Sequence, residues 1–206
     1  MTRRISPAVI LLSGAVCATV GFGLLSRQVK RHGTAHFDGR VRRRFPKRRE
    51  RAAKSAANTV GPLGKEWVHG PVAALAALYL WKRDRRAAAG SVLLSSVASA
   101  ALSHLFEATV TQRKPPKGRH SPTEPSFPSG HSLETMAVAL TTAYVLSREG
   151  IVNGRIAAPL AMAIPLVSGV SRVYLDRHWA TDVIAGWLAG TAVAATAAAV
   201  YETTAE

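Results

Sequence analysis

A short charged segment, Ser171 to Asp182 (SRVYLDRHWATD), holds residues whose types and spacing suit chemistry on an anionic group. Arg172 offers a planar fork of N–H donors, which matches phosphate oxygens. His178 and Asp182 are four residues apart, so on a helix or helical turn they share one face. A carboxylate in that place can hold the tautomer of the imidazole and leave the other ring nitrogen as a nucleophile. Asp182 would also be favoured by the dipole of a helix that begins beside it, and the two roles are compatible.

A second segment, Glu124 to Ser132 (EPSFPSGHS), directly precedes an apolar stretch and is typical of a helix start. Ser129 is a suitable N-cap residue, and Gly130 lets a ligand approach the backbone closely. Free N–H groups at such a helix start make an anion site. His131 would stand at the mouth of this site, where it could donate or accept a proton near neutral pH.

The rest of the chain has to position these two segments, and its composition admits two kinds of protein. The chain carries a formal net charge of +15 and 48 % hydrophobic residues in a length of 206. A positive face can bind nucleic acid, whereas basic residues that flank apolar runs are typical of a membrane protein. The apolar runs, with no strand signal between them, are residues 5–25, 67–81, 87–110, 132–146, 156–170 and 183–200. We therefore expect an all-α integral membrane protein, a six-helix bundle.

The N-terminal part is predicted to be a membrane helix followed by a basic arm. Residues 5–25 carry no charge and are long enough to span a bilayer; a cleaved signal peptide is the alternative, because two Arg residues precede the run. Arg27 to Lys54 is the densest basic segment, and we expect a solvated arm that lies on anionic lipid headgroups. A nucleic-acid arm is less consistent, since interleaved aromatic residues are lacking. We divide the chain into residues 1–64, the helix plus arm, and 65–206, the core.

The two charged segments together resemble the second and third signature motifs of the type 2 phosphatidic acid phosphatase superfamily, which includes lipid phosphatases, glucose-6-phosphatase and vanadium haloperoxidases. The third motif reads Ser-Arg, five residues, His, three residues, Asp, and Ser171 to Asp182 matches every fixed position. Pro128 to His131 completes the second motif, with 39 residues between it and the third, as is usual in the family. The resemblance extends from about Trp67 onward, so it implies a phosphatase core and leaves out the basic arm.

The first signature motif, which reads Lys, six residues, Arg-Pro, is altered in this chain. The best register puts Lys114-Pro115 at the Arg-Pro position and Glu107 at the Lys position. An acid therefore stands where the family has a phosphate-binding cation. We expect Lys114 to bind phosphate, with Arg113 as the second choice. Lys117 and Arg119 are further cations that could replace the missing Lys.

The resemblance implies a reaction in two steps. His178 would attack phosphorus and form a phosphohistidine, while Asp182 orients the imidazole. His131 would protonate the leaving alcohol and then help to activate water. The non-bridging oxygens would be held by a group of donors, namely Lys114, Arg172, Ser129 and the Gly130 N–H. No metal ion or other cofactor is implied, and the single Cys17 excludes a disulfide framework and a Cys-rich metal site.

We therefore predict a metal-independent membrane phosphatase for lipid-borne phosphate monoesters or diphosphates, of the phosphatidate or polyprenyl type. Its partners would be membrane lipids, the lipid phosphate substrate and anionic headgroups at the basic arm, with no nucleic acid. One alternative is a non-catalytic relative that binds lipid phosphates, for which Glu107 argues. A basic membrane-tethered nucleic-acid binder is another. A vanadate-dependent haloperoxidase is the third, although those proteins are typically longer and soluble.

Both motif segments and the basic arm are predicted to lie on one side of the membrane, because each follows an odd number of crossings. Of the 27 Lys and Arg residues, 19 lie on that side and 8 on the other. The positive-inside rule then places the site at the cytoplasmic face. The bias toward Ala and Arg indicates a high-GC bacterium, and hence a bacterial plasma membrane. His69 and His104 are expected to be membrane-interface residues.

Overall fold

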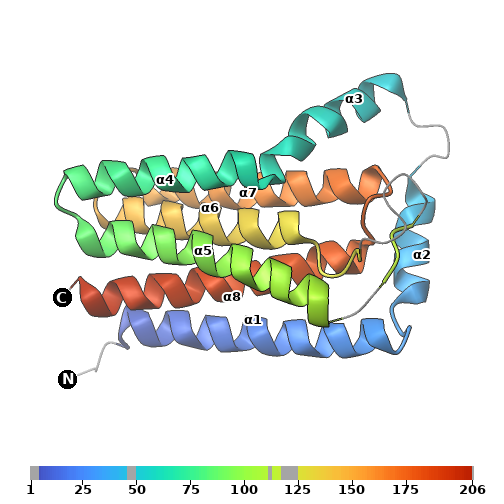
Figure 1. The fold of residues 1–206 in the computed structure, drawn as a ribbon, viewed down its shortest axis with the longest axis horizontal. Coiled ribbons are helices and arrows are strands. Elements are labelled where there is room, and N and C mark those ends of the chain that lie inside the picture. The colour runs from blue at the N-terminus through green and yellow to red at the C-terminus, as the bar shows by residue number, and fades with distance from the viewer. Residues whose placement is uncertain (1–4, 46–49, 111–112, 117–124, 206) are drawn as a thin grey trace.

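The computed structural model describes residues 5–45, 50–110, 113–116 and 125–205, and across these ranges the regular structure is entirely helical (Figure 1). The predicted all-α class is therefore confirmed. The helices are α1 (Pro7–Lys30), α2 (Ala35–Arg44), α3 (Arg51–Val60), the 3-10 helix η1 (Gly61–Gly64), α4 (Glu66–Lys82), α5 (Arg86–Thr109), α6 (Gly130–Arg148), α7 (Gly154–Tyr174) and α8 (Ala180–Thr204).

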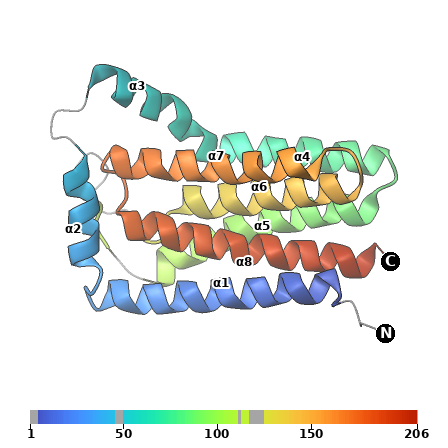
Figure 2. The ribbon, with the colours of Figure 1, turned by 180° about the vertical axis from the view of Figure 1, so that it is seen from behind.

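The long helices lie side by side, each antiparallel to the long helix that precedes it in the chain (Figures 1 and 2). They are α1 and α4 to α8, and each overlaps one predicted apolar run. Within the described part of the chain, α1, α5, α7 and α8 are long and apolar enough to cross a membrane. α2 crosses the end of the bundle at which α6 and α8 begin, here called the motif end. The opposite end, with the turns after α4 and α6, is called the far end.

Helices α6 and α8 pack closely because α8 presents Gly186 and Gly190 to α6. A Cβ atom at Gly186 would lie 2.5 Å from the carbonyl oxygen of Ser129, and one at Gly190 would overlap the carbonyl oxygen of Leu133. Small residues four positions apart let helices approach closely in a membrane. The starts of α6 and α8 are thereby held side by side, and the Ser129 N–H donates to the Asp182 carbonyl oxygen at 3.0 Å.

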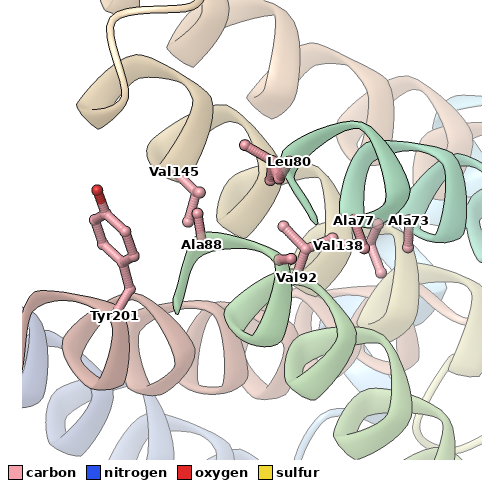
Figure 3. Close-up of a cluster of buried hydrophobic side chains, with 9 residues drawn as sticks. Ala73, Ala77, Leu80, Ala88, Val92, Val138, Val145 and Tyr201 are labelled. Carbon is pink, nitrogen blue, oxygen red and sulfur yellow. The ribbon is translucent and has the colours of Figure 1, made fainter. Parts of the chain in front are cut away.

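The far half of the bundle is filled by small apolar side chains (Figure 3). Leu80 and Val92 are fully buried there, between α4, α5 and α6. Because lipid is as apolar as these side chains, close packing rather than exclusion of water holds them together. The buried cluster comprises Ala73, Ala77, Leu80, Ala88, Ala89, Val92, Val138, Val145 and Tyr201. This packing supports the helices whose other ends carry the polar residues of the motif end.

Helix α1 supports the segment that leads into α6. It lies along α8 (Figures 1 and 2) and carries Phe22 toward the motif end. The Phe22 ring stacks on Phe106 of α5, with 4.8 Å between centroids, and faces Phe127 at 6.3 Å. Phe127 is completely buried. The N-terminal helix therefore belongs to the same packed body as the motif segments.

The basic segment differs from the solvated arm that we expected. It contains two regular helices, α2 and α3, and α2 is fixed to the motif end. The Asp38 side chain is 1 % exposed, and Arg42 Nε donates to Asp176 Oδ1 at 3.0 Å. These helices are short, and α2 is held by polar contacts to residues more than a hundred positions away. The sequence of α2 has no apolar periodicity that would predict a helix.

Candidate active site

His178 lies in the turn between α7 and α8, where its Nδ1 atom is 2.9 Å from the carbonyl oxygen of Ser126. α7 ends in a Schellman motif, in which Asp176 is left-handed (φ 56°) and the Arg177 N–H donates to the Arg172 carbonyl at 2.9 Å. This turn reverses the chain and brings His178 back to the bundle end. Because a carbonyl oxygen only accepts, the contact requires a proton on Nδ1, and in the neutral ring this fixes the Nδ1–H tautomer. Nε2 then carries the lone pair that a nucleophile needs.

Asp182 is completely buried in the first turn of α8. Its Oδ2 accepts from the Trp179 N–H at 2.8 Å, as an acid near a helix N-terminus does. Its Oδ1 accepts from Arg113 Nη1 at 2.9 Å. Oδ2 lies 3.9 Å from His178 Nδ1, which is longer than a hydrogen bond. Of these two acceptors, the Ser126 carbonyl is the one within hydrogen-bond distance of His178 Nδ1, and the carboxylate lies farther away.

The start of α6 brings the residues of the second motif to the same place. Ser129 is the N-cap residue, but its hydroxyl accepts from Ser132 Oγ at 3.1 Å and caps no N–H. A Cβ atom at Gly130 would overlap Ser103 Oγ, so the glycine allows α5 to approach. The N–H groups of a first helical turn have no partner within the helix. His131 Nε2 is buried and has no hydrogen-bond partner among the described residues.

Arg172 is 2 % exposed in the last turn of α7. Its guanidinium packs against η1, so closely that a Cβ atom at Gly61 would overlap Nη2. Nε has no hydrogen-bond partner within the part of the chain that the structure describes. A buried cation with unused donor capacity suits an anionic ligand.

The two cations predicted from the first motif, Arg113 and Lys114, have different surroundings. Arg113 donates from Nη2 to Asp38 at 2.6 Å and from Nη1 to Thr181 and Asp182, so its guanidinium is surrounded by acceptors. Lys114 has an exposed side chain, and its carbonyl accepts from Trp179 Nε1 at 2.9 Å. The further candidates Lys117 and Arg119 lie outside the described residues.

A pocket of about 640 Å³ opens beside His131, between η1, α4, α5 and α6. Lys65 lines it and is close enough to His131 for an electrostatic interaction. His69, which we expected at the membrane interface, is instead 7 % exposed, with Nε2 3.0 Å from Glu134 Oε2. The lining residues are Gly64, Lys65, Glu66, Trp67, Ser103, His104, Glu107, Gly130, His131 and Glu134. Glu107 therefore faces the same space as Lys65.

Sequence reasoning missed three contributors to this site. The Ser126 carbonyl could not be found, because a backbone acceptor has no residue signature. Lys65 lies before α4, outside the motif segments. Asp38 had one signal, since it is the only acid between Arg27 and Arg49. Among the residues that the structure describes, no group of three or more His, Cys, Asp or Glu side chains is arranged to hold a metal ion.

Three comparisons show which known proteins this chain is similar to in sequence and fold. The family model described as PAP2 superfamily matches residues 88–205. An undecaprenyl-diphosphatase of Sulfolobus acidocaldarius is 33 % identical over 138 residues, which cover 62 % of this chain and 60 % of that protein. The chain thus spans about 60 % of the length of this curated relative. The crystal structure of the first transmembrane PAP2 type phosphatidylglycerolphosphate phosphatase from Bacillus subtilis matches with a TM-score of 0.75. That match covers 87 % of this chain and 92 % of the other at 21 % identity, so it shows the fold.

Proposed function

The chain belongs to the PAP2 superfamily and is an integral membrane protein, and on that premise we propose that it is a phosphatase for lipid-borne phosphate monoesters or diphosphates. The observation that carries the proposal is the convergence of the two motif segments. His178 Nδ1 contacts the carbonyl of Ser126, and the Ser129 N–H donates to the carbonyl of Asp182. Each segment thus fixes the other, as a preorganised site for phosphoryl transfer requires.

The first step is the transfer of the phosphoryl group to His178. The Nε2 lone pair forms a bond to phosphorus, and the bond from phosphorus to the leaving oxygen breaks. His131 supplies the proton that the leaving oxygen takes up. In the second step a water molecule attacks the phosphohistidine and His131 takes its proton, so that phosphate leaves and both imidazoles return to their starting states. Asp182 stabilises the positive charge that develops on the His178 ring.

The non-bridging oxygens carry the charge that has to be balanced during both steps. Arg172 supplies donors at the end of α7, and the N–H groups of Gly130 and His131 supply donors at the start of α6. Lys65 supplies a cation in the pocket that Glu107 also lines. Its positive charge offsets the negative charge of Glu107, the acid at the first-motif position. Lys114, with its exposed side chain, would meet the phosphate from the rim of the site.

The substrate is proposed to be a phosphatidate, a phosphatidylglycerol phosphate or a polyprenyl phosphate or diphosphate. The motif segments meet at the end of the bundle where α6 and α8 begin (Figure 1), and we expect this end to lie at the level of the lipid headgroups. The similar proteins named above are an undecaprenyl-diphosphatase and a phosphatidylglycerolphosphate phosphatase, which supports both classes. In this proposal cations, imidazoles and helix N–H groups would face the phosphate, and the described residues offer no cluster of metal ligands there, so we propose that no metal is required.

We further propose that the protein lies in a bacterial plasma membrane with its motif end toward the cytoplasm. Of the Lys and Arg residues that the structure describes, 6 lie at the far end and 14 at the motif end. The positive-inside rule favours that orientation. Single-cysteine labelling of whole cells, in a Cys17→Ser background, tests it: reagent that stays outside should label a Cys placed at Asp84 and spare one placed at His36. The reverse pattern would contradict the orientation.

The function is tested by phosphate release in detergent with EDTA present, from phosphatidate, phosphatidylglycerol phosphate, farnesyl phosphate and farnesyl diphosphate. We expect release from at least one of them, reduced at least 10³-fold in His178→Ala. His36→Ala is the matched control, because His36 is exposed on α2 at the same end of the bundle. Absence of release from folded wild-type protein would contradict the proposal. It would favour the non-catalytic relative, with Glu107 as the reason.

A further inference from the structure

Asp38 is a buried carboxylate outside the region that matches the family model. It lies on α2, in the middle of the basic segment, and its side chain is 1 % exposed. Oδ1 accepts from the Thr181 N–H at 3.0 Å. Oδ2 accepts from Thr181 Oγ1 at 2.7 Å and from Arg113 Nη2 at 2.6 Å. Both oxygens are therefore bound to residues at the motif end.

Asp38 shares one partner, Arg113, with Asp182, and its other partner, Thr181, precedes Asp182 in the chain. Arg113 Nη1 donates to Asp182 Oδ1 at 2.9 Å, so one guanidinium bridges two buried carboxylates. Thr181 precedes Asp182 in the first turn of α8, and Asp38 accepts from one of the N–H groups that this turn leaves without a helical partner. Arg113 also lies over the Trp179 ring, 5.0 Å from its centroid. The residues that follow His178, from Trp179 to Asp182, are thereby tied to α2.

We propose that Asp38 is a positioning residue, which fixes Arg113 and Thr181 and through them the place of the Asp182 carboxylate beside His178. The inference rests on the proposed phosphatase function. Buried charges are costly to remove from water and need good pairing. Asp38 is paired with Arg113 and with Thr181, which adjoins the turn that carries His178. A small displacement of such a group can reduce a rate about 10²-fold, while it leaves substrate binding nearly unchanged.

A role in positioning can be separated from a role in docking α2. α2 has a second tie to the same turn, because Arg42 Nε donates to Asp176 at 3.0 Å, with its guanidinium 5.8 Å from the Trp179 centroid. This pair is partly exposed, at 32 % and 24 % of the side chains, whereas the Asp38 bridge is made by Arg113 and Thr181. Arg42→Ala weakens the docking of α2 but leaves the Asp38 bridge, so it is a matched control.

The first arm of the test measures kcat and KM for Asp38→Asn, which keeps the shape and removes the charge. We expect kcat to fall about 10-fold to 100-fold and KM to stay within about threefold, as expected for a lost transition-state contribution. Arg42→Ala should stay within about threefold of wild type in kcat. In an Arg113→Met background, Asp38→Asn should cause a much smaller further loss, because the two residues act in one network. Equal losses in Asp38→Asn and Arg42→Ala would overturn the proposal, since docking alone would then explain them.

The second arm needs no turnover and measures the binding of inorganic vanadate and inorganic phosphate by vanadium NMR and by competition. Vanadate can take up the five-coordinate geometry of the transition state, and phosphate cannot. We expect Asp38→Asn to weaken vanadate binding at least 10-fold and phosphate binding less than threefold. If the wild type proves inactive, the proposed function fails, and this arm alone decides the role of Asp38. Vanadate binding equal to wild type would overturn the inference. Should Asp38→Asn fail to fold, Thr181→Val tests the same link and should act in the same direction.

Discussion

The two ends of the bundle both bury carboxylates, but they surround them differently. At the far end Glu202 accepts from Tyr144 at 2.8 Å and from Arg148 Nε and Nη2 at 2.7 and 2.9 Å. Glu149 accepts from the Tyr201 hydroxyl at 2.8 Å. The guanidinium of Arg148 is half exposed, so water reaches this cluster. Such pairs tie the ends of α6 and α8 together and are structural.

At the motif end two carboxylates, Asp38 and Asp182, are fully buried. Asp38 and Asp182 share Arg113, and neither is exposed by more than 1 %. Close by, His131 Nε2 and Arg172 Nε are buried with no hydrogen-bond partner among the described residues. Such atoms destabilise a fold unless a ligand uses them. The comparison teaches that the far-end carboxylates form satisfied pairs that hold helices together, whereas the motif end keeps two buried nitrogen atoms, His131 Nε2 and Arg172 Nε, with hydrogen-bonding capacity for a ligand.

The largest expected effect follows from the change His131→Asn at the motif end. Loss of the acid should reduce turnover of an alkyl phosphate about 10³-fold. An aryl phosphate, whose leaving group needs no proton, should lose about 10-fold or less. The measurement is kcat for both substrates with the same protein preparation. Equal losses for the two leaving groups would remove His131 from the role of general acid.

A smaller effect is expected from Gly61→Ala, which leaves every charged residue in place. The backbone of Gly61 is helical (φ −56°, ψ −41°), so Ala fits it, but the added Cβ would overlap Nη2 of Arg172. The displaced guanidinium should lower kcat/KM about 10²-fold. Gly90→Ala is the control, because a Cβ there meets nothing within 4 Å. Wild-type kcat/KM in Gly61→Ala would mean that the place of Arg172 is unimportant.

The replacement Lys65→Ala should have a moderate effect, of about 10-fold in kcat/KM, because a cation in the pocket beside His131 is lost. The difference from wild type should shrink at high salt, since a half-exposed charge is screened. Lys82→Ala at the far end removes the same charge and should leave kcat/KM unchanged. A loss of the same size in Lys82→Ala would show that overall charge, rather than the pocket, is responsible.

The smallest effect on activity is expected at the far end. Glu202→Gln removes the charge that Tyr144 and Arg148 contact, and it should lower the free energy of unfolding by about 1 kcal/mol. Turnover should stay within about twofold of wild type. Thermal unfolding in detergent and phosphate release from the same sample check both. A large loss of turnover at unchanged stability would contradict the view that the far-end pairs are structural and the motif end carries the activity.

The long helices could be predicted because apolar runs in a membrane protein are local signals. Residues 132–146 and 156–170 were predicted, and α6 (Gly130–Arg148) and α7 (Gly154–Tyr174) contain them. The short helices α2 and α3 could not, because α2 is fixed by polar contacts such as Asp38 with Thr181, 143 positions apart. Such a long-range pairing cannot be predicted from a hydropathy pattern.

The candidate site was predictable where spacing carries the chemistry. The separation of His178 and Asp182 indicated a turn that brings them near each other, and they lie 3.9 Å apart at their closest polar atoms. What spacing could not provide was the partner of the imidazole, since the Ser126 carbonyl is 52 positions away and has no side-chain signature. Arg113 was predicted to bind phosphate, which stays a prediction, and the ion pairs of its guanidinium with Asp38 and Asp182 could not be predicted from the sequence.

The central claim, a covalent intermediate on His178, is tested most directly by the stereochemical course at phosphorus. The substrate is an isotopically chiral thiophosphate analogue of the best lipid phosphate, and the configuration of the released thiophosphate is determined. Two successive in-line displacements, first by the His178 imidazole and then by water, predict retention of configuration. Inversion would mean that water attacks the substrate in a single step, and it would contradict the account.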